Sequence, residues 1–352
     1  MLPFLATLAV FSPGDWTAVI SLQPYRASNE AMHSAGVASL YAFDLNGRMV
    51  KRLTKGSSSN FNPRCTAGET SVSFIQGALS DSGQIEGSLQ EMTLTSNGRI
   101  QSGHPIIGRP ALQIYWNSTD AWPRFAFSQT QQIKQNADGF YHVSDYKVET
   151  VATSTDIRVS PDLKHVLVNA TSCVDLTTRK VTKLSHNVRE AGWLDSERVF
   201  GLEWLGSSTE SDPSSLAGEV FNVQGKPLQR FKLRANALPQ IGPKDELRYI
   251  WPTPTANIYL LDFRHWIRLG CLDFVVRINL ETAESSQVLK EAILAQSPDR
   301  RYLVTAERTE RSLDEPVTCI VRIRDLKTGS SQPIQFPQYL SPRGACFIPN
   351  HR

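Results

Sequence analysis

One unit recurs along the whole chain: a short apolar segment, a turn rich in Ser, Pro, Asp and Gly, and a second apolar segment directly after the turn. Clear copies are LAVFSPGDWTAVIS (8–21), IYWNSTDAWPRFAFS (114–128), IRVSPDLKHVLVNA (157–170) and ILAQSPDRRYLVTA (293–306). Weaker copies are NPRCTAGETSVSFI (62–75), EAGWLDSERVFGLE (190–203) and QYLSPRGACFIP (338–349). Because self-similarity at a period of a few tens of residues is typical of repeat folds, we expect one small structural unit to be repeated.

A second half-unit follows each copy except the last. It is an alternating apolar–polar segment, a turn containing Asp, Asn, Gly or Thr, and a segment that ends in polar residues; it covers 39–54, 88–102, 140–153, 172–185, 219–233, 274–289 and 319–336. Alternation with period two and tight turns predict β-hairpins, and no comparable helical periodicity is present. Two hairpins per unit predict a four-stranded antiparallel sheet.

A series of such sheets must bury both faces of every sheet. Radial stacking around a central axis achieves this, so we predict an all-β, single-domain β-propeller that spans residues 1–352. We expect seven blades; an eight-bladed ring with an incomplete last blade stays open, because the hairpin at 338–349 has no partner strands after it. The approximate blades are 7–54, 60–105, 112–153, 156–185, 188–233, 244–290 and 292–336, with a closing hairpin at 338–349.

The repeat resembles that of TolB-like propellers, also called the WD40-like PD40 repeat. The Ser-Pro-Asp turns at 160–162 and 297–299 and the related turn at 12–15 are similar to the first half of that repeat. Asp44-Leu45-Asn46-Gly47 and Arg52-Leu53-Thr54 are similar to the second half. The segments around 65–68 and 251–254 depart from the pattern. The resemblance implies a propeller fold, a protein-binding role and an extracytoplasmic, periplasmic location.

Composition and charge exclude several classes of partner. The formal net charge of +3 over 352 residues is small, and no block of Lys and Arg concentrates it, so we expect neither nucleic acid nor an anionic membrane as partner. No apolar run approaches the roughly 20 residues that cross a bilayer. The apolar start, MLPFLATLAVF, lacks a basic segment and a small-residue cleavage site, so we interpret Leu8–Phe11 as the inner strand of blade one rather than a signal peptide. The compartment therefore stays open.

The five cysteines are scattered and form no C-x-x-C pair. Neither a zinc site nor a disulfide framework is visible in the spacing, so buried free thiols are expected.

Long connections fall on one side of the expected blades. If the strands of each blade run outward from the axis, the insertions all join second to third strands: 22–37, 76–87, 129–139, 205–218, 264–272 and 307–317. Blade four alone keeps a tight connection there. Loops that lengthen on one face of a rigid scaffold are typical of a binding surface, although tolerance of insertions would produce the same pattern. The candidate binding residues in these segments are Tyr25, Arg26, His33, Arg264, His265 and Trp266.

No catalytic or metal-binding pattern is found. The seven histidines show neither H-x-H nor H-E-x-x-H spacing, and no G-x-S-x-G elbow is present. The recurrent aspartates stand where turns need a side-chain acceptor: Asp15, Asp44, Asp162, Asp175, Asp299 and Asp325. We therefore predict no catalytic residues, no metal and no cofactor.

Two hypotheses from different classes follow. The first, which we favour, is a non-catalytic scaffold that binds a protein or peptide on the face with the long connections, as a monomer or in a hetero-complex. The alternative is a propeller hydrolase or lactonase with a metal at the mouth of the central channel, whose ligands would come from several blades and leave no local motif.

Overall fold

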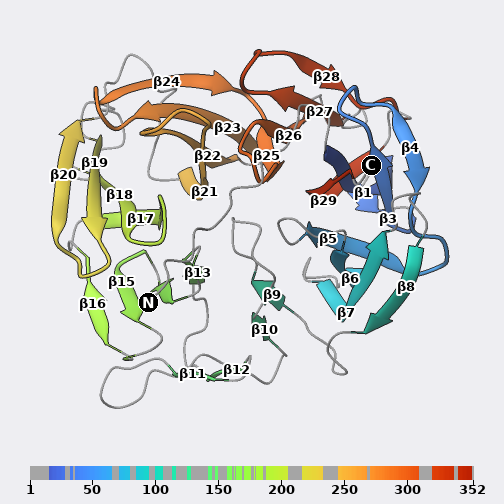
Figure 1. Ribbon diagram of the computed structural model, residues 1–352, viewed down its shortest axis with the longest axis horizontal. Helices are drawn as coiled ribbons and strands as arrows, with labels where there is room; N and C mark the ends of the chain where they lie inside the picture. The colour runs from blue at the N-terminus through green and yellow to red at the C-terminus, as the bar shows by residue number, and fades with distance from the viewer. Residues whose placement is uncertain are drawn as a thin grey trace, which may run out of the picture.

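In the computed structural model the chain folds into antiparallel sheets arranged around a central axis (Figure 1). The structure describes residues 16–27, 32–34, 36–65, 71–79, 85–94, 100–105, 113–115, 125–127, 142–144, 147–149, 157–160, 162, 164–168, 170–175, 178, 180–184, 188–204, 216–232, 245–267, 270–308, 319–336 and 340–350. No helix in these ranges is long and apolar enough to cross a membrane.

Within the described ranges the strands form one five-stranded sheet, five four-stranded sheets and two separate pairs. The first part of the chain supplies β1 (Trp16–Ala27), β2 (Met32–Ser34), β3 (Ser39–Phe43), β4 (Met49–Arg52), β5 (Ser59–Cys65), β6 (Ser71–Leu79), β7 (Ile85–Leu94), β8 (Ile100–Pro105), β9 (Gln113–Tyr115), β10 (Phe125–Phe127), β11 (His142–Ser144) and β12 (Lys147–Glu149). The middle supplies β13 (Ile157–Val159), β14 (His165–Val168), β15 (Ser172–Asp175), β16 (Val181–Lys183), β17 (Val188–Trp193), β18 (Arg198–Trp204), β19 (Leu216–Asn222) and β20 (Pro227–Lys232). The last part supplies β21 (Asp245–Pro252), β22 (Ile258–Ile267), β23 (Gly270–Asn279), β24 (Glu284–Leu289), β25 (Ala292–Gln296), β26 (Tyr302–Arg308), β27 (Cys319–Asp325), β28 (Ser331–Pro333) and β29 (Leu340–Pro349).

The sheets have the strand order expected of propeller blades. We number them by the predicted blades: β5–β8 is blade two, β13–β16 blade four, β17–β20 blade five, β21–β24 blade six and β25–β28 blade seven, and in each the strands follow one another in chain order. In Figure 1 their first strands lie toward the middle of the ring and their last strands lie at its rim. The pairs β9–β10 and β11–β12 occupy the part of the chain expected to form blade three. The count of seven blades stays a prediction.

Blade one is completed by the end of the chain. β29 pairs with β1 from Trp16 opposite Pro349 to Pro24 opposite Leu340, while β3 pairs with the other edge of β1. The expected closing hairpin is therefore one strand, and it holds the innermost position that we had predicted for residues 8–11. Those residues lie outside the described ranges. The prediction was wrong about this position because both edges of β1 already have partners.

A disulfide joins the ring closure to the next blade. Cys65 of β5 and Cys346 of β29 are bonded, with Cα atoms 5.8 Å apart and a sequence separation of 281 positions. The expectation of free buried thiols was wrong for this pair, because a separation of that size leaves no local spacing signal. Cys173 and Cys319 are in no disulfide; Cys173 is buried and Cys319 is partly exposed.

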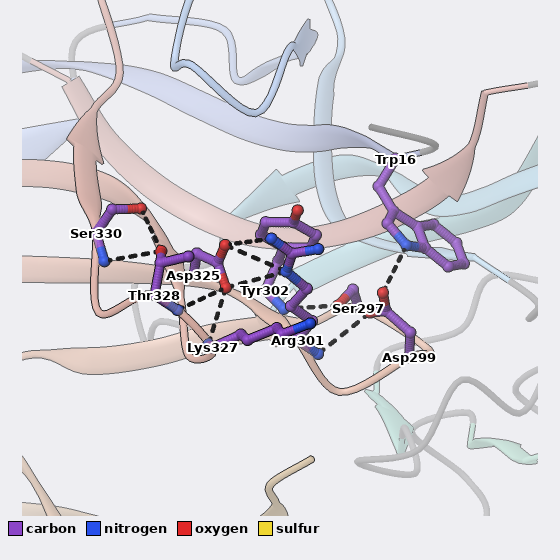
Figure 2. Close-up of polar contacts among 9 residues, drawn as sticks. All are labelled: Trp16, Ser297, Asp299, Arg301, Tyr302, Asp325, Lys327, Thr328 and Ser330. Carbon is purple, nitrogen blue, oxygen red and sulfur yellow. Dashed lines mark hydrogen bonds and ion pairs between the residues drawn. The ribbon is translucent and has the colours of Figure 1, made fainter. Parts of the chain in front are cut away.

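The Ser-Pro-Asp turn of blade seven is held by a side-chain network (Figure 2). The Ser297 hydroxyl donates a hydrogen bond to Asp299, which also accepts one from the backbone N–H of Arg301 at 3.2 Å. The Arg301 guanidinium pairs with Asp325 of the neighbouring turn at 2.7 Å, and lowers the pKa of that carboxyl to about 2. The Trp16 indole N–H donates to Asp299 at 3.2 Å, so the turn also contacts blade one.

The turn role predicted for the aspartates is confirmed where the structure describes them. Each accepts a hydrogen bond from a backbone N–H two to four residues later, as in Asx turns; they are Asp44, Asp162, Asp175, Asp299 and Asp325. Asp15 lies outside the described residues.

Gly47 is one turn residue whose backbone and surroundings both require glycine. Its φ is +76°, and a Cβ there would stand 2.4 Å from the Pro333 carbonyl oxygen of blade seven. We expect Gly47→Ala to lower the free energy of unfolding by about 1–3 kcal/mol, through left-handed strain and the clash. Gly329 is the matched control, because its φ is +73° and no atom lies within 4 Å of a Cβ built there. Denaturant melts should show a larger loss for Gly47→Ala than for Gly329→Ala; equal losses would mean that the contact with blade seven contributes nothing.

Apolar side chains of adjacent blades pack face to face and form the core. Phe347 and Trp16 of blade one pack with Val304 of blade seven, and Phe200 of blade five packs with Phe263 of blade six. Burial of these faces, at roughly 25 cal/mol per Å² of apolar surface, drives the stacking of the sheets.

Candidate functional site

The predicted binding residues near the start of the chain lie on one hairpin. Tyr25 and Arg26 are in β1 and His33 is in β2; Arg26 stands directly opposite His33 in the pairing. Most described residues of the segment 22–37, which was expected as a loop, are therefore in strands. Its mixed polar composition gave no alternating pattern from which the pairing could be predicted.

The second predicted group lies on blade six and is also strand. Arg264, His265 and Trp266 belong to β22, which pairs with β23 without a break from Ile258 opposite Asn279 to Ile267 opposite Gly270. The expected insertion at 264–272 is thus a lengthened hairpin, whose pairing extends to Ile267 opposite Gly270. The added residues extend the backbone pairing of both strands, so they need no loop of their own.

These two hairpins reach the same side of the ring. β1 and β22 are each the second strand outward in their blade and run in the same direction relative to the axis, so their last residues lie on one face. We call it the B–C face, because second strands connect to third strands there. The pairings of blades two, five and seven also extend to this face, at Leu79 opposite Ile85, Trp204 opposite Leu216 and Arg308 opposite Cys319.

Blade four differs, as expected, and keeps a tight connection on the B–C face. Val168 pairs with Ser172, and Ala170 between them takes a φ of +56°. The expected insertion at 129–139 lies outside the described residues.

His265 is held by a buried carboxylate. Its Nδ1 hydrogen-bonds the Asp245 carboxylate on the neighbouring strand β21, directly opposite in the pairing. The Asp245 side chain is almost fully buried, whereas 35% of the His265 side chain is exposed. A carboxylate bonded to one ring nitrogen fixes the orientation of the imidazole, so His265 is presented at the surface in one pose.

Arg264 is anchored in a similar way, to the next strand outward. Its Nε donates to Asp273 Oδ1 at 3.1 Å, and Arg248 of β21 lies 3.6 Å from the same oxygen. The Asp273 side chain is only 4% exposed. One buried carboxylate therefore serves two arginines, a charge-assisted arrangement that restricts the Arg264 side chain.

Asp262, two residues before Arg264 on β22, is completely buried, and neither of its carboxylate oxygens makes a hydrogen bond to the described residues. Burial raises its pKa to about 7, against a smaller lowering by Arg248. Sequence reasoning missed Asp262, Asp273 and Asp245. One sequence signal could have found this cluster. Charged residues stand at alternate positions, Asp262 and Arg264, of a mainly apolar strand, and such spacing indicates polar side chains on one face of the sheet.

The site supplies fixed charges, hydrogen-bond donors and one oriented imidazole. In the part of the chain that the structure describes, no group of three or more His, Cys, Asp or Glu side chains is arranged to hold a metal ion. The half-exposed Leu272, 38% accessible, stands opposite His265 and adds apolar surface to the hairpin.

The chain shows distant similarity to solved structures. No protein-family model and no curated protein matches the chain. Among solved structures, a protein assigned as TolB from Agrobacterium tumefaciens is similar at 10% identity and a TM-score of 0.38, over 94% of this chain and 92% of that chain. The β-propeller domain of the trilobed protease from Pyrococcus furiosus is similar at 11% identity and a TM-score of 0.30, over 79% and 71%.

A third similar structure is hydrazine synthase from Kuenenia stuttgartiensis, at 10% identity and a TM-score of 0.43, over 96% of this chain. The chain spans about half of that longer chain, 47% of its length. The predicted fold class is confirmed: the described residues are all-β and form several four-stranded antiparallel sheets, and the solved structures to which the chain is similar include β-propellers.

Proposed function

We propose that this protein is a non-catalytic propeller that binds a protein or peptide on its B–C face. One observation carries the proposal: the second strands of blades one and six each continue into a hairpin on that face, which carries Tyr25 and Arg26 in blade one and Trp266 in blade six, with Arg264 and His265 immediately before it in the sheet. Arg, Tyr and Trp are the residue types that dominate binding energy at protein interfaces.

Pre-organisation supports the same function. Arg264 and His265 each bond a buried carboxylate, Asp273 and Asp245, so little side-chain entropy is lost when a partner binds them. In the described residues, short turns on the opposite face are closed by side chains of their own, such as Asp44, Asp299 and Asn222, whose oxygens accept hydrogen bonds from backbone N–H groups of the same turn.

The finer family assignment is also a proposal. We propose a seven-bladed, TolB-like propeller of PD40 repeats on the basis of the Ser-Pro-Asp turns. In both blade four and blade seven the Ser hydroxyl of this turn donates a hydrogen bond to the Asp carboxylate, from Ser160 to Asp162 and from Ser297 to Asp299. The Cys65–Cys346 disulfide supports the proposal that the protein functions in an oxidising compartment, because structural disulfides persist there.

We expect Trp266→Ala combined with Leu272→Ala to weaken binding of a partner recovered from the native host by about 2 kcal/mol or more, roughly 30-fold in Kd. Trp266 and Leu272 suit the test better than Arg264. Removal of Arg264 would take away one of the positive charges that balance the buried Asp273 carboxylate, and would therefore reduce stability. Titration calorimetry measures the affinity.

Gly47→Ala on the opposite face is the control: it should lower the melting temperature and leave affinity unchanged. Loss of binding in the Gly47 variant, with normal binding in the hairpin variant, would place the working face on the other side. A stoichiometric Ca²⁺ or Zn²⁺ in purified protein would favour the metal-dependent hydrolase instead.

A further inference from the structure

Blades six and seven meet through an apolar layer that identifies which side chains face the interface. Trp251, Leu260 and Val275 of blade six pack with Ile293 and Leu303 of blade seven. Successive side chains of a strand point to opposite faces, so residues an even number of positions from these apolar ones share their face along a regular strand. On β21 an irregularity between Leu247 and Tyr249 shifts this alternation; Glu246 shares the face because it stands opposite Arg264, and Arg248, within the irregularity, reaches Asp273 at 3.6 Å. The same interface therefore receives a set of charged side chains on the B–C side of the apolar layer.

The charged set comes from every strand packed there. On blade six the groups are Glu246 and Arg248 of β21, Asp262 and Arg264 of β22, and Asp273 of β23; on blade seven they are Glu291 before β25, Glu307 of β26, and Arg322 and Arg324 of β27. The Ile293 backbone N–H of β25 also faces Asp262, without reaching hydrogen-bonding geometry.

In blade seven, Arg322 and Arg324 form ion pairs with carboxylates of the same blade. Arg324 pairs with Glu291 through Nε at 2.8 Å, and Arg322 pairs with Glu291 at 3.2 Å and with Glu307 at 3.0 Å. Glu291 is buried, and these bonds lower its pKa despite the opposing effect of burial.

In blade six, by contrast, the buried carboxylates differ in how many hydrogen bonds they accept. Asp273 receives Arg264 at 3.1 Å and Arg248 at 3.6 Å, while both oxygens of Asp262 and one of Asp273 lack a hydrogen bond to described residues. Arg248 lies between the two carboxylates: it contacts Asp273 beyond hydrogen-bonding distance and also attracts Asp262. A buried carboxylate without a donor is costly when it is ionised.

We propose that Asp262 and Arg248 form a proton-controlled switch at the interface of blades six and seven. With Asp262 neutral, Arg248 stays with Asp273 and the blades pack as described. When Asp262 releases its proton to solvent, its negative charge draws Arg248 away from Asp273, and the contact between the blades loosens on the B–C side.

The direction of the pH effect follows from burial. The folded-state pKa of Asp262 is raised from 3.8 to about 7, mainly by burial, so the folded protein binds a proton that the unfolded chain has already lost. Stability from this group is complete below pH 4 and is lost as the pH rises toward 7. The switch therefore favours the tightly packed interface on the acidic side of neutrality.

Carboxyl ¹³C NMR of the full chain, labelled at aspartate, tests the proposal directly. We expect one Asp carboxyl with a titration midpoint between about pH 6 and 8, which is absent in Asp262→Asn and shifts upward in Arg248→Met, because Arg248 stabilises the ionised form. A wild-type protein in which every Asp carboxyl titrates below about pH 6, or a midpoint that Arg248→Met leaves unchanged, would overturn the switch.

Thermal melts provide a second readout. At pH 8.5 Asp262→Asn should melt several degrees above the wild type, and the difference should shrink as the pH falls toward 4.5. Glu307→Gln removes a carboxylate from the same interface and should show no such gain at high pH. Parallel curves for the wild type and Asp262→Asn would count against the proposal, and the wild-type NMR titration still decides if a variant does not fold.

Discussion

Replacing Cys65 and Cys346 by serine is expected to lower the free energy of unfolding by roughly 2–5 kcal/mol. The disulfide closes a loop of 281 residues between β5 and β29, so its loss returns a large amount of conformational freedom to the unfolded chain. It also releases the strand that completes blade one from its covalent link to blade two. Denaturant melts of the oxidised wild type and the double variant measure the difference.

Reduction of the wild type with dithiothreitol should reproduce the loss, whereas the double variant should not respond to it. Cys173→Ser and Cys319→Ser are the thiol controls, since neither residue is in a disulfide. If the wild type keeps the same stability under reducing and oxidising conditions, the covalent closure does not contribute.

Phe347→Ala is expected to destabilise the fold by about 3–5 kcal/mol, the usual cost of removing a buried aromatic ring and leaving a cavity. Phe347 is 1% exposed and lies in β29, where its ring packs among side chains of blades one and seven. The variant therefore weakens the contact by which the last blade meets the first. Chemical denaturation, followed by tryptophan fluorescence, gives the free energy.

Val288→Ala is a suitable comparison, because Val288 lies on the outer strand β24 with 41% of its surface accessible. Its loss should be less than about 1 kcal/mol. Similar losses for the two variants would mean that β29 is not an integral strand of blade one.

The turns show which features of the fold can be predicted from neighbouring residues alone. Ser297, Asp299 and Asp325 stand at fixed offsets within their own turns, and each accepts a hydrogen bond from a backbone N–H a few residues away. Such bonds depend only on nearby residues, so the repeat, the hairpins and the propeller fold could be predicted. The binding candidates Arg26 and His33 were found by residue type alone, and their direct pairing was not predictable because their segment shows no alternation.

The sequence by itself determined the repeated four-stranded unit and the short turns closed by their own side chains, since these depend on periodicity and turn chemistry within about 40 residues. Only the tertiary structure decided that β29 completes blade one, that Cys65 meets Cys346, and that Asp262 is buried against blade seven. Those contacts join residues from different blades or from opposite ends of the chain. Their partners are set by closure of the ring and by which face of each sheet meets its neighbour, and no local pattern encodes either.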